Sequence, residues 1–229
     1  MTLGAPRIHR RLTGSTNADA QALAIAGAPH GTLVTAAEQT DGRGREGRSW
    51  FSPPGSSLLC SLVLRDAPPL LSLRAGVAVA EVVGPDAMLK WPNDVLVGGR
   101  KVSGILVEAR PREGWSVLGI GINVAVALVE LPEDIQETAG TLGLDATAVE
   151  PTLAELLRRL DPWLARPAAE VVRAVRERDA LLGAELEWKS GRGIGAGIDP
   201  DGRLRVKLGD GSEVALDAGE VSLLAGPRP

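Results

Sequence analysis

Two apolar segments of the chain are separated by the stretch Gln39-Thr-Asp-Gly-Arg-Gly-Arg-Glu-Gly-Arg-Ser-Trp50, in which arginines alternate with glycines. The flanking residues 32–38 and 57–65 are apolar, so we predict two strands joined by this loop. Glycine lets the backbone adopt unusual dihedral angles and approach a ligand closely, and a guanidinium group forms paired hydrogen bonds with phosphate or carboxylate. The stretch therefore predicts an anion-binding loop beside a sheet.

A more ordinary interpretation of this loop is a solvated hairpin that carries incidental charge. The Trp50-Phe51 pair favours the binding site, because aromatic residues are scarce in this chain, with five Trp, one Phe and no Tyr. No Gly-Lys-Ser/Thr follows the loop, so it is not a P-loop. We expect side chains on a flexible loop, and not a rigid backbone cradle, to hold the phosphate.

Outside this loop, the first 183 residues mix helical and strand patterns. Helices are expected, from N-cap residues and apolar spacing, at 15–27, 70–83, 152–165 and 168–182. In the third helix, Thr152 and Glu155 have the spacing of a capping box. Further strands are expected at 96–97, 101–108 and 116–126, with a tight turn at Gly98-Gly99.

After Gly183 the pattern changes to short alternating strands. Turn signals at 199–202 and 210–211 are those that a small β-barrel requires. The alternate glycines of 191–197 imitate a dinucleotide-binding fingerprint, but they do not open a helix, so we interpret them as barrel structure. We therefore predict an α+β fold with two domains, residues 1–183 and 184–229.

The overall composition excludes several classes of function. A net charge of −4 over 229 residues argues against general affinity for nucleic acid, which needs a concentrated basic excess. The single cysteine, Cys60, excludes an internal disulfide and a multi-cysteine zinc site, and it favours a reducing, cytoplasmic compartment. No stretch approaches the roughly 18 consecutive apolar residues of a membrane span. We expect neither DNA nor a membrane as a partner.

A second informative stretch is Lys90-Trp-Pro-Asn-Asp94, which is followed at a short distance by residues 101–106. On a hairpin the two segments face each other, and Lys101, a carboxylate, an amide and Gly104 then describe a site for a nucleotide phosphate with a metal ion. Taken alone, Pro-Asn-Asp indicates only a turn. In a third stretch, Gly119-Ile-Gly-Ile-Asn123, small residues within a strand leave room for a planar ring.

Together these segments resemble the motifs of the biotin protein ligases, in the same order along the chain. The matching segments are 15–17, 42–50, 90–94 with 101–106, and 119–123, and the C-terminal segments 197–202 and 219–222 resemble that family's SH3-like domain. The resemblance implies a class II synthetase-like mixed sheet flanked by helices, followed by a small SH3-like β-barrel. Only 14 residues precede Ser15. We therefore expect a monofunctional type, without the N-terminal DNA-binding winged helix of bifunctional members.

The resemblance also implies an activity and its partners. Family members form biotinyl-5′-AMP from biotin and ATP, release pyrophosphate, and transfer biotin to one lysine of a biotin carboxyl carrier protein domain. Biotin is then a substrate, Mg²⁺ accompanies ATP, and Asp94 is the predicted magnesium ligand. The protein is expected to be a monomer or a homodimer.

Site residues follow from the same resemblance. Arg45 and Lys101 are the predicted catalytic residues, at the junction of carboxylate and α-phosphate. The predicted biotin-binding residues are Ser15, Thr16, Asn17, Gln39, Arg43, Gly44, Arg45, Lys101 and Gly104. The predicted ATP- and adenylate-binding residues are Arg45, Arg48, Trp50, Asn93, Lys101 and Asn123.

Three other functions compete with this interpretation. A lipoate-type ligase shares the acyl-adenylate chemistry, but it should lack the paired arginine-glycine and Lys-Trp-Pro-Asn-Asp motifs. A non-catalytic biotin sensor would need a DNA-reading element, which this sequence does not show but which a partner protein could supply. A plain nucleotide-binding module would not need the segment 15–17.

Overall fold

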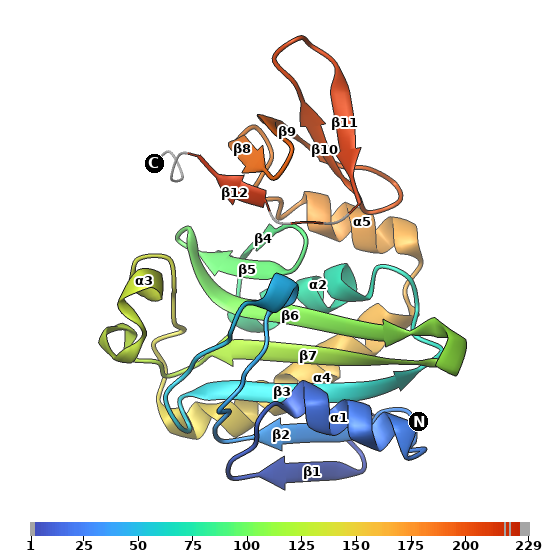
Figure 1. The fold of residues 1–229 in the computed structure, drawn as a ribbon, viewed down its shortest axis with the longest axis vertical. Helices are drawn as coiled ribbons and strands as arrows, with labels where there is room; N and C mark the ends of the chain where they lie inside the picture. The colour runs from blue at the N-terminus through green and yellow to red at the C-terminus, as the bar shows by residue number, and fades with distance from the viewer. Residues whose placement is uncertain (1–2, 218, 220, 225–229) are drawn as a thin grey trace.

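The computed structural model describes residues 3–217, 219 and 221–224. Within them the chain forms a seven-stranded mixed sheet and, at its C-terminal end, a five-stranded antiparallel sheet (Figure 1). The predicted fold class, a mixed sheet flanked by helices with a second small β unit, is confirmed. No helix among these residues is both long enough and apolar enough to cross a bilayer.

The large sheet has the strand order β1-β2-β3-β7-β6-β5-β4. Only β1 and β2 run parallel, and the other neighbours are antiparallel. The strands span Arg7–Arg10 (β1), Leu33–Ala36 (β2), Ser57–Arg65 (β3), Met88–Lys90 (β4), Asp94–Val97 (β5), Arg100–Arg110 (β6) and Trp115–Asn123 (β7). Their long central members, β3, β6 and β7, form the platform for the candidate site.

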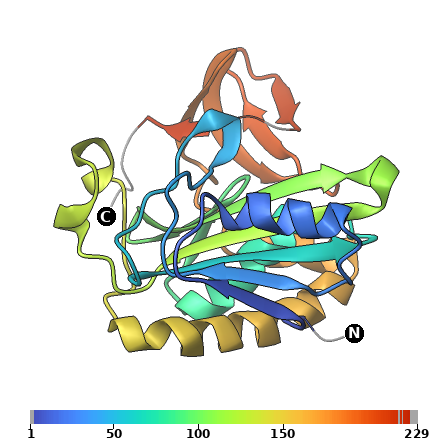
Figure 2. The same cartoon turned by 60° about the horizontal axis from the view of Figure 1, so that its bottom comes forward.

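Helices cover the two faces of this sheet unequally (Figure 2). On one face α2 (Leu71–Val83) packs on α4 (Val149–Ala165) and on α5 (Ala168–Arg176). Leu62, Leu118 and Ile122 are fully buried in the main core. This burial supplies most of the hydrophobic stabilisation, since aliphatic side chains contribute about 1.5–3 kcal/mol each when fully buried.

On the opposite face, α1 (Thr16–Ile25) is the only covering helix among the described residues, and it contacts β2, β3 and β7. A small apolar cluster, which includes Ala20, Ala24, Val63 and Val117, lies beneath the helix. Beyond the N-terminal end of α1 this face is left to the arginine-glycine loop, which Figure 2 shows rising toward the second sheet. The uncovered part of the platform is the floor of the candidate site.

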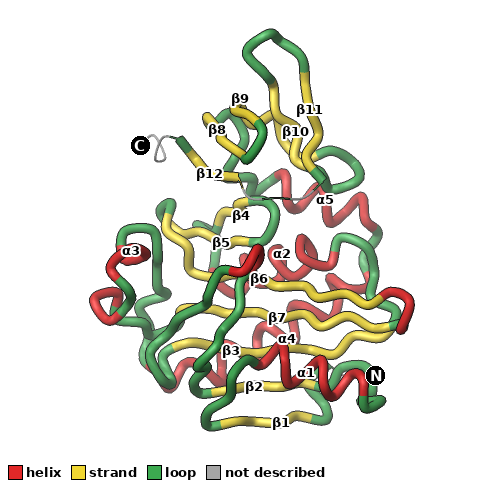
Figure 3. The backbone as a smooth tube through the Cα atoms, viewed as in Figure 1, coloured by secondary structure: helices red, strands yellow, loops and turns green. Residues whose placement is uncertain are grey.

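The second sheet begins at Glu185 and has the order β11-β10-β9-β8-β12 (Figure 3). Its strands span Glu185–Trp188 (β8), Gly191–Ile198 (β9), Leu204–Lys207 (β10), Glu213–Leu216 (β11) and Val221–Leu223 (β12). The alternate glycines of 191–197, which we interpreted as barrel structure, lie in β9. The turn at 199–202 reaches the large sheet, because the buried Trp91 indole donates a hydrogen bond to the Gly202 carbonyl at 3.0 Å.

Several predicted elements agree closely with the structure. The strand predicted at 57–65 matches β3, the helix predicted at 70–83 matches α2 within one residue, and Gly98-Gly99 forms the β5–β6 turn with positive φ at both residues. Two details are wrong. The helix predicted from Thr152 begins at Val149, and the Thr152 hydroxyl donates to the Ala148 carbonyl, so no capping box forms there. The helix predicted to reach residue 182 ends at Arg176.

The sequence patterns did not predict β1, β4 or the short helix α3 (Glu133–Gln136). β1 reads Arg-Ile-His-Arg and its residues are mostly exposed, so no apolar run marks it. The strand is held by parallel pairing with β2 and by a bidentate contact of Arg7 with Glu150 on α4, at 2.6 and 2.7 Å. This ion pair raises the pKa of Arg7 and lowers the pKa of Glu150.

Candidate active site

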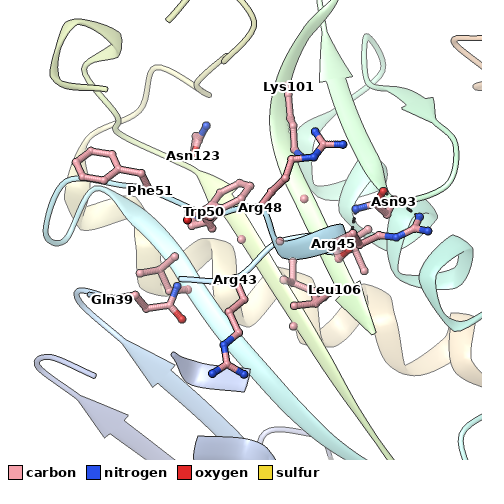
Figure 4. Close-up of a pocket in the computed structure, with 18 of the residues that line it drawn as sticks. Gln39, Arg43, Arg45, Arg48, Trp50, Phe51, Asn93, Lys101, Leu106 and Asn123 are labelled. Carbon is pink, nitrogen blue, oxygen red and sulfur yellow. Dashed lines mark hydrogen bonds between the residues drawn. The ribbon is translucent and has the colours of Figure 1, made fainter. Parts of the chain in front are cut away.

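One cavity of about 230 Å³ lies on the part of the sheet that α1 leaves uncovered (Figure 4). It is walled by the start of α1, the arginine-glycine loop, β5, β6 and β7. All fourteen residues that the sequence predicted for the site line this one cavity. They are Ser15, Thr16, Asn17, Gln39, Arg43, Gly44, Arg45, Arg48, Trp50, Asn93, Asp94, Lys101, Gly104 and Asn123.

The end of the cavity next to α1 is polar and buried. Ser15, Thr16 and Asn17 are each less than 5% exposed, although they lie at a helix start. Ser15 is the N-cap residue by position, but its side chain makes no capping hydrogen bond. The predicted helix is therefore correct, but its Ser15 side chain is not used as a cap. The Gln39 side-chain oxygen accepts hydrogen bonds from the Thr16 backbone N–H at 2.7 Å and from the Thr16 hydroxyl at 3.0 Å.

The arginine-glycine loop folds back on itself as a strap over the cavity. The Gly44 N–H donates to the Arg48 carbonyl at 2.7 Å, and the Trp50 N–H donates to the Gly42 carbonyl at 2.8 Å. A side chain at position 42 would lie 2.3 Å from the Trp50 carbonyl oxygen, so this close return requires glycine. At the tip of the strap Glu46 has φ +55°, which is strained for a residue other than glycine.

The Trp50 indole lies on the sheet at a pair of glycines. Gly104 on β6 faces Gly121 on β7 in register, and a side chain at either position would lie within 3 Å of the indole ring. The space that the sequence predicted for a planar ring is thus occupied by a tryptophan of the same chain. Among the described residues the Trp50 Nε1 has no hydrogen-bond partner, although it is buried.

The opposite end of the cavity is cationic. The Lys101 ammonium lies 2.7 Å from Asp94 Oδ1 and 5.7 Å from the centroid of the Trp50 ring. Asp94 faces Gly104 across the β5–β6 pair, as expected from a hairpin. The Arg45 guanidinium donates to Asn93 Oδ1 at 3.4 Å, while the Asn93 amide donates to the Ile105 carbonyl at 2.9 Å (Figure 4). Two cations are therefore held by groups of the Lys-Trp-Pro-Asn-Asp turn.

Asn123 is buried at the end of β7 and already has partners within the protein. Its amide donates to the Gly140 carbonyl at 2.8 Å, and its side-chain oxygen lies 3.5 Å from the Ser57 hydroxyl. The backbone of residues 138–140 in turn forms a bridge with Lys101. The predicted contact of Asn123 with adenine remains a prediction, and in this structure the side chain holds the segment that follows β7.

Sequence reasoning missed the part of the cavity wall that this segment supplies. Leu131, Ile135, Thr138 and Ala139 come from the turn region around α3 and close one side of the cavity. Leu131 precedes α3 and Ile135 lies within it, so no single helical pattern in the sequence marks the two residues as one wall. Cys60 also lines the cavity, and burial raises the pKa of its thiol to about 12, so it is not a nucleophile at neutral pH.

This arrangement is suited to an elongated ligand with a polar head and an anionic tail. Hydrogen-bonding groups surround one end, aliphatic residues and the indole form the middle, and Arg45, Arg48 and Lys101 form the other end (Figure 4). Cationic groups in a partly buried site stabilise negative charge more strongly than they would in water.

Comparison with known proteins identifies the family. The sequence pattern of the biotin/lipoate A/B protein ligase family matches residues 10–125, and that of the biotin protein ligase C-terminal domain matches residues 189–224. The biotin--[acetyl-CoA-carboxylase] ligase of Mycobacterium tuberculosis is 38% identical, over 91% of this chain and 85% of that protein. The chain belongs to the biotin protein ligase family.

Two further biotin ligases support the assignment. The biotin--[acetyl-CoA-carboxylase] ligase of Paracoccus denitrificans is 35% identical, over 91% of this chain and 97% of that protein. The biotin protein ligase of Aquifex aeolicus, solved in complex with biotin and ATP, superposes with a TM-score of 0.81 at 29% identity, over 96% of this chain and 98% of that chain. As a biotin protein ligase, the chain is an enzyme. Most of the residues that line the cavity fall within the segment that the family pattern matches.

Proposed function

We propose that this ligase forms biotinyl-5′-AMP from biotin and ATP and then transfers the biotinyl group to a lysine of a biotin carboxyl carrier protein domain. The observation that carries the proposal is that one cavity joins a buried polar end, at Thr16 and Gln39, to a cationic end, at Arg45 and Lys101. Biotin has matching ends, a ureido ring and a carboxylate. The division into a catalytic domain, residues 1–183, and a C-terminal domain, residues 184–229, belongs to the same proposal.

The first step requires no strong base. A carboxylic acid has a pKa of about 4.3 and is ionised at neutral pH, so its oxygen attacks the α-phosphorus while the bond to the β-phosphate oxygen breaks and pyrophosphate leaves. The obstacle is repulsion between two anions. We assign Arg45 and Lys101 to the carboxylate and α-phosphate, and Arg48 to the phosphates. Removing one such donor typically slows a reaction by ~10²–10³.

The remaining assignments follow the polarity of the cavity. Ser15, Thr16, Asn17 and Gln39 line the end suited to the ureido ring, and Arg43, Gly44 and Gly104 complete the walls around biotin. Trp50, Asn93 and Asn123 are assigned to the adenylate. In the second step the amine of the carrier lysine attacks the acyl carbon and AMP leaves, and the residue that accepts the amine proton is left unassigned.

The residues at the cationic end also fit a magnesium ion that arrives with ATP. Asp94 Oδ1 is buried and, within the described residues, makes no directed hydrogen bond, although Lys101 lies 2.7 Å away. Those residues contain no cluster of three His, Cys, Asp or Glu side chains, so Asp94 would supply one ligand and phosphates and water the others. When bound, Mg²⁺ would neutralise phosphate charge.

The test is a single incubation of the protein with biotin and ATP without any carrier, followed by denaturation and mass spectrometry of the small molecules. We expect biotinyl-5′-AMP and pyrophosphate in about equal amounts. A parallel incubation with lipoate in place of biotin distinguishes the lipoate-type alternative. The absence of any acyl-adenylate with biotin, or preferential formation of lipoyl-AMP, would contradict the proposal.

A further inference from the structure

A chain of hydrogen bonds runs beneath the polar end of the cavity and ends outside it. The Asn17 amide donates to the Glu108 carboxylate at 2.8 Å, and Asn17 Oδ1 lies 2.6 Å from the Ser61 hydroxyl. The Ser61 oxygen lies 2.8 Å from the Thr16 hydroxyl, which lies 3.0 Å from Gln39 Oε1. Thr16, Asn17 and Gln39 line the cavity, whereas Ser61 is completely buried behind them.

At both ends of this hydrogen-bond network, the donor and the acceptor are fixed. A carboxylate only accepts hydrogen bonds, so Glu108 orients the Asn17 side chain with its NH₂ group toward β6 and its oxygen toward Ser61. At the other end, the Thr16 backbone N–H only donates, so it turns the Gln39 oxygen toward Thr16. Gly119 leaves the space for this arrangement, because a side chain there would lie 2.1 Å from Asn17 Oδ1.

Between these two ends, the network of hydrogen bonds is one hydrogen atom short. Three contacts need a hydrogen, namely Asn17 to Ser61, Ser61 to Thr16, and Thr16 to Gln39. The two hydroxyl groups supply only two, since each carries one hydrogen. One oxygen at the cavity wall is therefore left as an acceptor, and a donor from a water molecule or a ligand must complete the network.

We propose that Glu108 is a positioning residue that keeps this end of the cavity rich in acceptors and thereby selects a ligand with N–H groups. The inference rests on the proposed function, in which the ureido ring of biotin supplies those N–H groups. Glu108 does not line the cavity and acts through Asn17, Ser61 and Thr16.

The substitution Glu108→Gln keeps the size of the side chain and removes the fixed polarity. The new amide can donate to Asn17, whose side chain then turns and donates to Ser61, so that three hydrogens fill all three contacts. Biotin binding must reverse this arrangement and lose about one neutral hydrogen bond. We expect the Kd of biotin to rise about fivefold, which corresponds to about 1 kcal/mol.

The experiment is titration calorimetry on the full chain, with biotin, with desthiobiotin and with a biotin analogue methylated on a ureido nitrogen. Desthiobiotin keeps both N–H groups, so its affinity should fall by the same fivefold in Glu108→Gln. The affinity of the methylated analogue should fall by less. The control variant Glu187→Gln changes an exposed glutamate on β8 and should bind as wild type does. The double variant Asn17→Asp with Glu108→Gln again presents an acceptor to Ser61, and it should recover most of the affinity for biotin.

Two results would overturn the inference alone, while wild-type protein still binds biotin. One is an unchanged Kd of biotin in Glu108→Gln. The other is an equal loss of affinity for biotin and for the methylated analogue, which is what a general structural role would produce. Failure of the wild-type protein to bind biotin would overturn the proposed function together with this inference.

Discussion

At the scale of single residues, the cationic end of the cavity is organised by one ion pair and one hydrogen bond within the protein. Lys101 is about one third exposed and lies against Asp94, while Arg45 is held by Asn93. Lys101 is thus held on the sheet before a ligand arrives, which is the condition for stabilising charge without reorganisation during the reaction, whereas Arg45 is carried by the strap.

Replacing Lys101 tests whether that charge is used. In Lys101→Ala the cation is lost and Asp94 remains as an unbalanced carboxylate near the phosphates. We expect the rate of pyrophosphate release to fall by ~10²–10³, with transfer to the carrier falling in parallel. Lys207→Ala, on an exposed lysine of β10, is the matched control and should keep its rate. Full activity of Lys101→Ala would reject the assignment.

Arg45 has a different expected effect, because it lies on the strap and not on the sheet. Arg45→Gly removes the contact with Asn93 and loosens the strap over the adenylate. We expect adenylate formation to persist while more biotinyl-5′-AMP escapes into a protein-free filtrate. Arg45→Lys keeps a positive charge and should release less biotinyl-5′-AMP than Arg45→Gly does. Equal retention of adenylate by wild type and Arg45→Gly would contradict this role.

Asp179, far from the chemistry, governs a pH dependence of stability. It lies between α5 and β8, is 9% exposed, and has one carboxylate oxygen without a hydrogen-bond partner among the described residues. Burial raises its pKa above the ordinary value. The folded state therefore binds this proton more tightly than the unfolded state, and stability falls as the pH rises from about 4, the unfolded pKa, through the folded pKa.

The substitution Asp179→Asn removes this charge while keeping an acceptor for the Leu181 N–H. We expect the variant to be more stable at pH 7 by about 1 kcal/mol, or roughly 2–4 °C in Tm, and the gain to vanish near pH 4. Differential scanning calorimetry at both pH values measures it. The exposed Glu177→Gln should change little at either pH. A variant that is destabilised at pH 7, or a gain independent of pH, would refute the account.

At the scale of elements, the strap of residues 42–50 is the part of the site with the fewest constraints. Its arginines are mostly exposed, its tip is strained at Glu46, and three backbone hydrogen bonds join the strap to itself. An acyl-adenylate is hydrolysed by water, so a cover that closes over the bound ligand has a clear use.

Limited proteolysis with trypsin tests this closure, since the strap contains three arginines. With biotin and ATP at ten times their Kd, cleavage within 41–48 should slow by about tenfold, because bound ligand favours the closed state. Cleavage after the exposed Lys189, in the turn between β8 and β9, serves as the internal control and should not change. Equal cleavage rates of the strap with and without ligands would disprove the closure.

The elements also explain how far the sequence could predict this structure. β3, α2 and the β5–β6 hairpin carry continuous apolar runs or a Gly-Gly turn, so local patterns were sufficient. β1 depends on pairing with β2 and on the distant Glu150, which no local pattern reveals. The small residues of 119–123 predicted room for a planar ring of a ligand, but only the folded chain shows that Trp50 lies against Gly121, and against Gly104 on the next strand.

At the scale of the whole molecule, the candidate site combines segments that are far apart in the sequence. The start of α1, the strap, the Lys-Trp-Pro-Asn-Asp turn and the end of β7 meet at one cavity because β3, β7 and β6 are neighbours in the sheet. The order of motifs, through family resemblance, predicted this convergence. The network of hydrogen bonds from Glu108 to Gln39 could not be predicted, since it depends on side-chain orientations across several elements.

The second sheet is joined to the site through the same turn that holds the cations. Trp91 lies within Lys-Trp-Pro-Asn-Asp, and its indole bonds to Gly202 in the turn after β9. A side chain at position 202 would lie 2.5 Å from Leu70, which accounts for glycine at this position. The sequence patterns identified both turns but could not show that they touch.

The most direct test of the central claim is the intact mass of an isolated biotin carboxyl carrier domain after incubation with this protein, biotin and ATP. We predict that the carrier gains the mass of one biotinyl group, and that a carrier with its acceptor lysine changed to arginine gains none. Omission of ATP should also prevent the gain. A carrier of unchanged mass, or one modified by lipoate in preference to biotin, would contradict the account.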